Sequence, residues 1–103
     1  MPTPAQILTR SVRDVFAMHG WVTFRCAAGM VRTEGGRMVV YGTKGAPDLV
    51  AIKGQRYCLL ELKTKHDKMQ PSQTAFAQEV GRVYGNYAII RSVDDAMKII
   101  QGE

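Results

Sequence analysis

The stretch KGAPDLVAIKGQRYCLLELKTK, from Lys44 to Lys65, contains two apolar runs that Gly54 and Gln55 separate. A Gly-X pair between two such runs is typical of a two-residue type II′ hairpin turn. We therefore predict an antiparallel strand on each side of this turn. The charged residues inside these runs need an explanation, because bare charge is costly in a strand that is covered on both faces.

The length of the turn decides which residues face each other across the hairpin. With two turn residues, Lys53 pairs with Arg56. The same register places Asp48 directly opposite Glu61, and Lys63 shares the face of Glu61 because side chains alternate along a strand. A turn of three residues would instead move Asp48 to the other face.

Two carboxylates that face each other repel unless something compensates their charge. A bound cation is the simplest compensation, and carboxylate oxygens are hard ligands suited to Mg²⁺ or Mn²⁺. Lys63 could offset part of this charge without metal, and could orient a water or a phosphate beside a metal. The alternative is that Asp48 merely begins a strand, while Glu61 and Lys63 face solvent near the end of the next one.

The residues around the hairpin predict one α/β domain over residues 1–103. Thr3, Pro4 and Gln6 form a helix-start pattern with a capping box. Residues 27–37 have glycines and charges with no sustained period, which indicates a loop or a ribbon tip. The expected elements are a helix over residues 4–19, strands over 21–26, from Met38, over 48–53 and over 56–64, a helix from Pro71 to Gly85, a strand over 87–92 and a terminal helix.

Composition narrows the class of protein. The chain has 103 residues, of which 46% are hydrophobic and 22% charged, and this composition excludes wholesale disorder. The net charge of +5 favours a polyanionic partner. Cys26 and Cys58 have no CxxC partner, so we expect reduced thiols in the cytoplasm and no zinc site. No apolar run approaches the roughly 18 residues of a membrane span, so we expect no membrane association.

Pro47-Asp48 followed by Glu61-Leu62-Lys63 resembles the signature of the PD-(D/E)xK nucleases. The surrounding segments GTKGAPDLVAI, LLELKT, QPSQ and YAIIRSVDDA are similar to those of VRR-NUC domains, small nuclease domains of phages, bacteria and larger repair nucleases. This resemblance covers nearly the whole chain. It implies a restriction-endonuclease-like core, in which helices flank a central mixed sheet of four to five strands in the order α-β-β-β-β-α-β-α.

The resemblance also implies roles for individual residues. Asp48, Glu61 and the backbone carbonyl of Leu62 would bind a divalent metal ion. Lys63 would position or activate the attacking water, and Gln73 matches a glutamine at the start of the following helix. Gln73 could equally serve as a hydrogen-bonding residue at that helix start.

Gln6 departs from the pattern of the family. Relatives often have a glutamate in the first helix that completes the metal shell, and this chain has Gln6 near that place. Gln6 is also explained as the capping partner of Thr3. The number of metal ions therefore stays open.

Basic side chains could form a surface that follows phosphates and binds less tightly as salt increases. The candidates are Lys44, Arg10, Arg25, Arg32, Lys65 and Lys68, with Arg13 and Arg37 as further members. Trp21 and the methionines are expected in the core.

Two functions are consistent with the sequence. The resemblance implies a Mg²⁺- or Mn²⁺-dependent endonuclease of branched DNA, a resolvase of Holliday junctions or a flap nuclease, without a small-molecule cofactor. It also implies a homodimer that acts in repair or recombination in a bacterial or phage-infected cell. The alternative is a DNA-binding or scaffolding module that keeps the nuclease fold with weak or absent cleavage.

Overall fold

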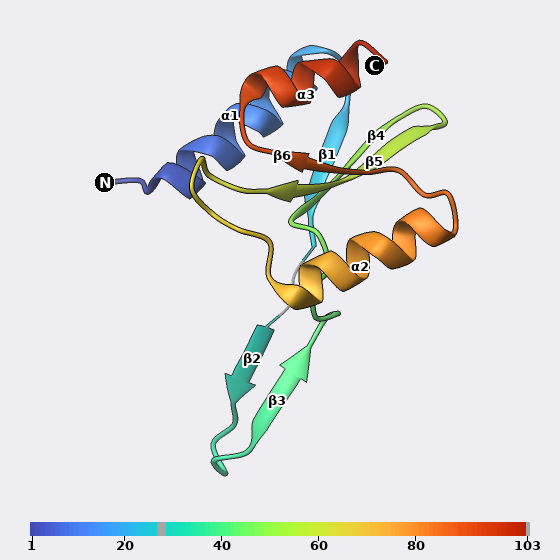
Figure 1. Ribbon diagram of the computed structural model, residues 1–103. Helices are drawn as coiled ribbons and strands as arrows, with labels where there is room; N and C mark the ends of the chain where they lie inside the picture. Colours follow the sequence, from blue (N-terminus) through green and yellow to red (C-terminus); the bar gives the residue numbers. More distant parts are fainter. Residues whose placement is uncertain (27–28, 103) are drawn as a thin grey trace.

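The computed structural model describes residues 1–26 and 29–102, with helices on both sides of a central sheet (Figure 1). The helices are α1 (Pro4–Met18), α2 (Pro71–Arg82) and α3 (Val93–Ile100). The strands are β1 (Val22–Arg25), β2 (Gly29–Arg32), β3 (Met38–Tyr41), β4 (Leu49–Lys53), β5 (Arg56–Leu62) and β6 (Tyr87–Ile90). The expected order of elements holds with one addition, since part of the expected loop or ribbon tip forms β2.

The main sheet has four strands in the order β1-β4-β5-β6. Its β1–β4 and β4–β5 pairs are antiparallel, whereas β5 and β6 are parallel. A parallel pair needs a long crossover, which α2 provides here. The prediction of a mixed sheet flanked by helices is confirmed. Strands β2 and β3 pair only as a separate two-stranded ribbon within the described residues.

The hairpin between β4 and β5 has the predicted two-residue turn. Lys53 pairs with Arg56, and Gly54 adopts a φ of 60°, which suits glycine. The regular ladder ends at the pair Leu49 and Leu60. Beyond it, the amide of Asp48 donates to the carbonyl of Leu60 at 3.0 Å. Asp48 is therefore not a regular ladder partner of Glu61, and its side chain reaches β5 in another way.

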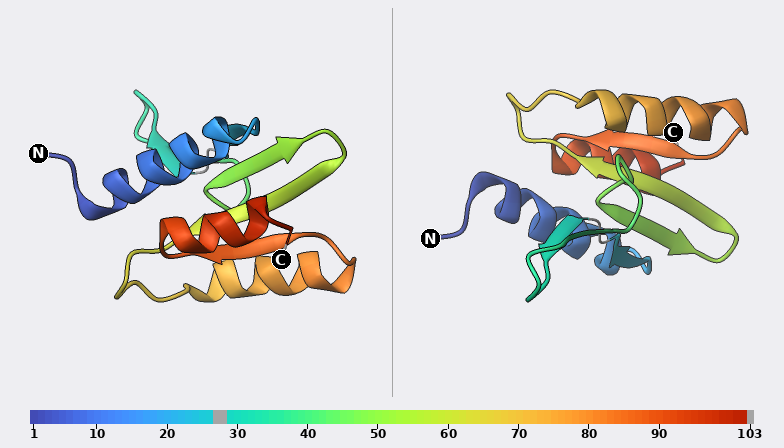
Figure 2. Two further views of the ribbon diagram at one scale, coloured as in Figure 1. Left: turned by 90° about the horizontal axis from the view of Figure 1, so that it is seen from above. Right: turned by 90° about the horizontal axis from the view of Figure 1, so that it is seen from below.

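The apolar core lies between the sheet and the pair α1 and α3. Phe16, Leu49 and Leu60 have no exposed surface, and Ile90 has 1%. Trp21 packs edge-on against Phe16, with ring centroids 5.3 Å apart, so its predicted place in the core is confirmed. In Figure 2, α3 covers β6 in the view from above and lies behind β6 in the view from below.

The expectation that the methionines pack in the core is wrong for four of them. Met1 is fully exposed ahead of α1. Met18, Met30 and Met38 are 81%, 66% and 49% exposed. Met18 is the last residue of α1, and the other two lie on the β2–β3 ribbon, which projects away from the core (Figure 1). Along the described parts of the chain, no helix is long and apolar enough to cross a lipid bilayer.

Candidate active site

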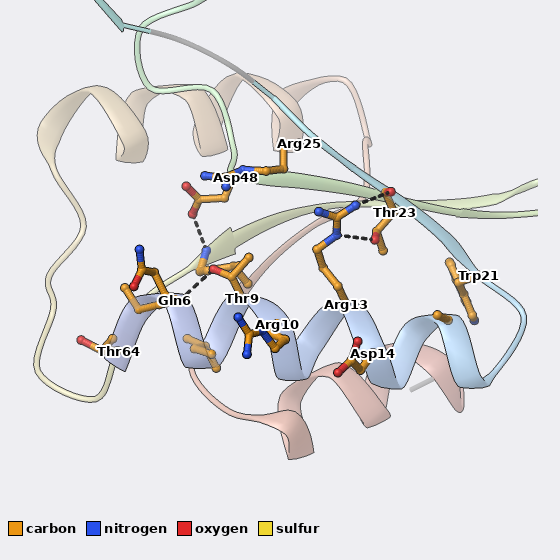
Figure 3. A pocket seen from close by; sticks show the side chains of 14 residues that line it. Gln6, Thr9, Arg10, Arg13, Asp14, Trp21, Thr23, Arg25, Asp48 and Thr64 are labelled. Carbon is orange, nitrogen blue, oxygen red and sulfur yellow. Dashed lines mark hydrogen bonds between the residues drawn. The ribbon is translucent and has the colours of Figure 1, made fainter. Parts of the chain in front are cut away.

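The carboxylate of Asp48 is held at the start of β4 by the backbone of β5. Its Oδ2 accepts a hydrogen bond from the amide of Leu62 at 2.7 Å, drawn as a dashed line in Figure 3. The preceding Pro47 is buried, and Asp48 itself is half-buried. Beyond the last regular β4–β5 pair, the Asp48 carboxylate therefore accepts the hydrogen bond from β5 that a backbone carbonyl would otherwise accept. This bond holds the Asp48 side chain against the end of β5.

Glu61 is a buried carboxylate near the end of the interior strand β5, with 2% of its surface exposed. Its Oε1 accepts a hydrogen bond from Nε2 of Gln73 at 2.9 Å and lies 3.9 Å from Nζ of Lys63. Among the residues that the structure describes, its Oε2 is buried without a hydrogen-bond partner. One oxygen of this carboxylate is therefore left to bind something else.

Burial and the neighbouring carboxylate both favour the protonated form of Glu61. Burial raises the pKa of Glu61 most, the neighbouring carboxylate of Asp48 raises it further, and Lys63 lowers it, so that it reaches about 7. Lys63 therefore compensates the negative charge only partly. A cation bound between the carboxylates would remove the remaining repulsion.

The oxygen atoms at this place suit a hard divalent cation. Asp48 and Oε2 of Glu61 can supply carboxylate oxygens. The amide of Leu62 faces Asp48, and the carbonyl of a strand residue lies on the same side of the strand as its amide, so this carbonyl is a further candidate ligand. In the described residues, no group of three or more His, Cys, Asp or Glu side chains could hold a metal ion. A cation here would keep several waters, which is common for Mg²⁺.

Gln73 makes two side-chain hydrogen bonds at the start of α2. Its Oε1 accepts from the amide of Gln70 at 2.8 Å, as a capping residue at the start of α2. Because its oxygen is used in this way, its NH₂ group must face Glu61. The start of α2 thus orients the buried carboxylate.

Gly45 brings the loop before Asp48 into close contact with the start of α2. A Cβ atom at Gly45 would lie 2.2 Å from the carbonyl oxygen of Ser72, and the φ of Gly45 is 83°. Only glycine fits such an approach. The neighbouring Lys44 is exposed on this loop, next to the segment that carries Asp48.

A cavity of about 900 Å³ lies between α1 and the sheet, with Asp48 in its wall. Figure 3 shows Gln6, Thr9 and Arg10 along α1, facing Arg25 and Asp48 on the sheet side. The cavity therefore gathers three of the expected DNA-binding arginines, Arg10, Arg13 and Arg25, and also Gln6, around one of the two carboxylates.

The expected DNA-binding arginines other than Arg10 and Arg25 either make other contacts or lie elsewhere. Arg13 lines the cavity but donates to Oγ1 and the carbonyl of Thr23, at 3.1 and 3.2 Å, so it also ties α1 to β1. Arg32 is exposed on β2 and Arg37 on the turn of the ribbon, away from the two carboxylates. Gln6 accepts a hydrogen bond from the amide of Thr3 at 2.9 Å, as predicted for the capping partner of Thr3.

The loop that follows Lys63 is held by a turn and by Arg91. Thr64 donates from its hydroxyl and its amide to Asp67, whose pKa these bonds lower. Arg91 donates to the carbonyls of Thr64 and Asp67 at 2.9 and 2.8 Å. Lys65 and Lys68 are exposed on this fixed loop beside the site.

Tyr87 is a residue near the carboxylates that the sequence did not reveal. Its hydroxyl is buried without a hydrogen-bond partner among the described residues, and its ring lies 6.5 Å from that of Phe76. Burial, followed by the charges of Glu61 and Asp48, raises the pKa of Tyr87 to about 12. Only the parallel pairing of β6 with β5 brings this side chain near the site, and no local pattern encodes that pairing.

The fold resembles that of a known nuclease domain. A solved structure described as a VRR_NUC domain superposes with a TM-score of 0.73 at 19% sequence identity, and the match covers 98% of each chain. The chain therefore has the VRR-NUC fold, a restriction-endonuclease-like mixed sheet flanked by helices, as its sequence indicated. No protein-family model and no curated protein matches the chain.

Proposed function

We propose that residues 1–103 form a single nuclease domain that hydrolyses phosphodiester bonds in DNA with Mg²⁺ or Mn²⁺. The observation that carries this proposal is the unpartnered, buried Oε2 of Glu61, next to Asp48 and Lys63. A protein that did not bind a cation would have little reason to bury this arrangement, because an uncompensated carboxylate destabilises the fold.

Each residue of the site then has a defined task. Asp48, Glu61 and the carbonyl of Leu62 would hold the metal ion, which when bound acidifies water and offsets charge on the phosphate. Lys63, only 9% exposed and 3.9 Å from Glu61, would orient the attacking water or the phosphate. Gln73 would keep Glu61 in its binding orientation.

The cavity between α1 and the sheet is the proposed path of the DNA backbone toward the metal site. Arg10 and Arg25 would contact phosphates inside it. The exposed Lys44, Lys65 and Lys68 would contact phosphates from the loops on either side of the site, with Arg32 farther out. Such contacts lose affinity steeply as salt is added.

The VRR-NUC fold and the sequence resemblance together support the finer part of the proposal. We expect an endonuclease selective for branched DNA, a Holliday-junction resolvase or a flap nuclease, acting as a homodimer. A two-fold dimer can present paired active sites to paired strands. Repair or recombination in the cytoplasm of a bacterial or phage-infected cell would be its setting.

Cleavage by the purified protein tests the proposal. The substrates are linear, flapped and four-way DNA with Mg²⁺, Mn²⁺ or EDTA, and the variants are Asp48→Ala and Lys63→Ala. We expect metal-dependent cleavage that falls about 10³-fold or more in both variants, because each loses part of the stabilisation of the reacting groups. Glu79→Ala and Lys98→Ala are matched controls on exposed positions and should cleave normally. Full cleavage by Asp48→Ala would contradict the assignment.

A second candidate is a DNA-binding module without useful cleavage. It is favoured by Gln6, whose Oε1 is used by Thr3 and which brings no carboxylate to the site from α1. Salt-sensitive binding of DNA, with no cleavage in either metal, would support this candidate over the nuclease.

A further inference from the structure

The β2–β3 ribbon exposes apolar side chains on both of its faces. We call residues 29–41 the arm. Met30 and Val31 are adjacent, so they point to opposite faces, and they are 66% and 52% exposed. On the partner strand, Met38 and Val39 are 49% and 41% exposed. An isolated two-stranded hairpin is marginally stable in water, so a surface of this kind calls for a packing partner.

A second apolar surface lies uncovered on the main sheet. Thr23 accepts a hydrogen bond from Arg13 of α1, so Thr23 faces the core, and its neighbours Val22 and Phe24 face the other way. Val22 pairs with Ile52 of β4, and Ile52 pairs with Tyr57 of β5, so these side chains form a row across three strands. We call Val22, Phe24, Ile52 and Tyr57 the open face.

The open face is on the same side of the sheet as α2, but α2 does not cover it. Val22, Phe24, Ile52 and Tyr57 are 66%, 47%, 39% and 43% exposed. Helix α2 contacts β6, at the opposite edge of the sheet from β1. On this face β1, β4 and the start of β5 therefore lack the helix that a sealed second face would need, whereas the end of β5 meets α2 through Glu61 and Gln73.

The arm does not cover the open face of its own chain. It begins beyond the ends of β1 and β4, where the amide of Cys26 still donates to the carbonyl of Asp48 at 2.9 Å. From there it extends away from the sheet (Figure 1). One molecule thus carries two exposed apolar surfaces that lie apart from each other.

We propose that the arm of one copy packs on the open face of a second copy, and that the exchange is reciprocal in a two-fold dimer. This inference specifies the contacts of the proposed homodimer and does not depend on cleavage. A stable interface buries at least roughly 1,200 Å² in total, so each of the two symmetric contacts would have to supply about half of that area. Because Asp48 lies at the base of the arm, the exchange would also fix the distance between the two proposed sites.

The chemistry of the arm favours a protein partner over DNA. Its charged residues are Arg32, Glu34 and Arg37, a net charge of +1, beside four exposed apolar side chains. Surfaces that bind DNA are polar and strongly basic, whereas the centres of homodimer interfaces are apolar. Methionine side chains adapt readily to such a surface.

Two charge-bearing variants test the proposal by analytical ultracentrifugation. The arm variant is Met30→Glu with Val31→Glu, which charges both faces of the arm. The open-face variant is Val22→Lys with Ile52→Lys. We expect the wild-type protein to be a dimer of twice 11.4 kDa. Each variant by itself should be a monomer. Its dimer dissociation constant should rise about 100-fold or more, because the dimer would bury the introduced charges.

Mixing the two variants gives the decisive result. In the mixed pair, one contact joins an unchanged arm to an unchanged open face, and the other joins Glu to Lys, so we expect a heterodimer to form. Its recovery also excludes misfolding as the reason for the monomers. The control Ile7→Glu with Met18→Glu, on exposed positions of α1, should remain dimeric.

Three outcomes would overturn the proposal. If the arm variant still forms dimers, the arm is not part of the dimer interface. If the open-face variant forms dimers while the arm variant does not, the two arms pair with each other. An arm variant that loses DNA affinity without any change in mass would assign the arm to DNA. A monomeric wild-type protein at high concentration would overturn the homodimer itself, while DNA cleavage by the same sample tests the nuclease separately.

Discussion

The two faces of the four-stranded sheet differ in whether they bury apolar or charged side chains. Toward α1 and α3, the large apolar residues Leu49 and Leu60 are fully buried. Toward α2, the buried residues include Glu61 and Lys63, while the apolar Phe24 is about half exposed. The first face stabilises the single chain. The second face carries the groups on which the proposed metal site and the proposed dimer contact rest, and its buried charges cost stability.

The largest expected effect compares two neighbouring leucines of β5. Leu60→Ala, on the sealed face, should lower the free energy of unfolding by about 2–5 kcal/mol, because it leaves a cavity among fully buried side chains. Leu59→Ala, on the face toward α2, should cost clearly less, since Leu59 is only half-buried. Denaturant unfolding measures both. Equal costs would show that the face toward α2 is packed as tightly as the other.

The next effect concerns pH and the charge of Glu61 in protein treated with EDTA. Folding raises the pKa of Glu61 from 4.5 to about 7, so its contribution to stability is fully present below pH 4.5 and is lost as the pH rises through 7. The free energy of unfolding should therefore fall over this range, and Glu61→Gln should remove that fall. Saturating Mg²⁺ should also reduce it, because a cation favours the ionised carboxylate. An unchanged slope in Glu61→Gln would assign the fall to other groups.

The smallest effect separates two glutamines that have the same local role. Gln6 and Gln73 each complete a capping box, so Gln6→Ala and Gln73→Ala should each cost about 1 kcal/mol or less in stability. Only Gln73 also donates to Glu61. Gln73→Ala should therefore weaken Mg²⁺ binding by about 10- to 100-fold, as loss of a group that orients a ligand does. Calorimetric titration measures this, and an equal loss in Gln6→Ala would place Gln6 in the metal shell.

Local sequence patterns predicted much of the fold. The Gly54-Gln55 turn fixed the pairing of Lys53 with Arg56, and the capping pattern at Thr3 located the start of α1. Both follow from interactions between residues a few positions apart. The prediction that Asp48 directly opposes Glu61 was less accurate, because the regular ladder ends one pair earlier.

Long-range contacts could not be predicted in the same way. The bond from the amide of Leu62 to Asp48 depends on where the ladder ends, and the position of Tyr87 depends on the parallel pairing of β6. Exposure of Met30 and Met38 depends on where the arm points, not on their own hydrophobicity. No short-range preference encodes these facts.

The sequence from Lys44 to Lys65 by itself determined that a hairpin forms and that Glu61 and Lys63 share one of its faces, because turn length and strand alternation are local properties. Tertiary structure alone decided that this face is buried, that α2 presents Gln73 to Glu61, and that the other half of the face stays open. Those outcomes depend on how α2 and β6 pack against the hairpin, and packing is a property of the whole chain.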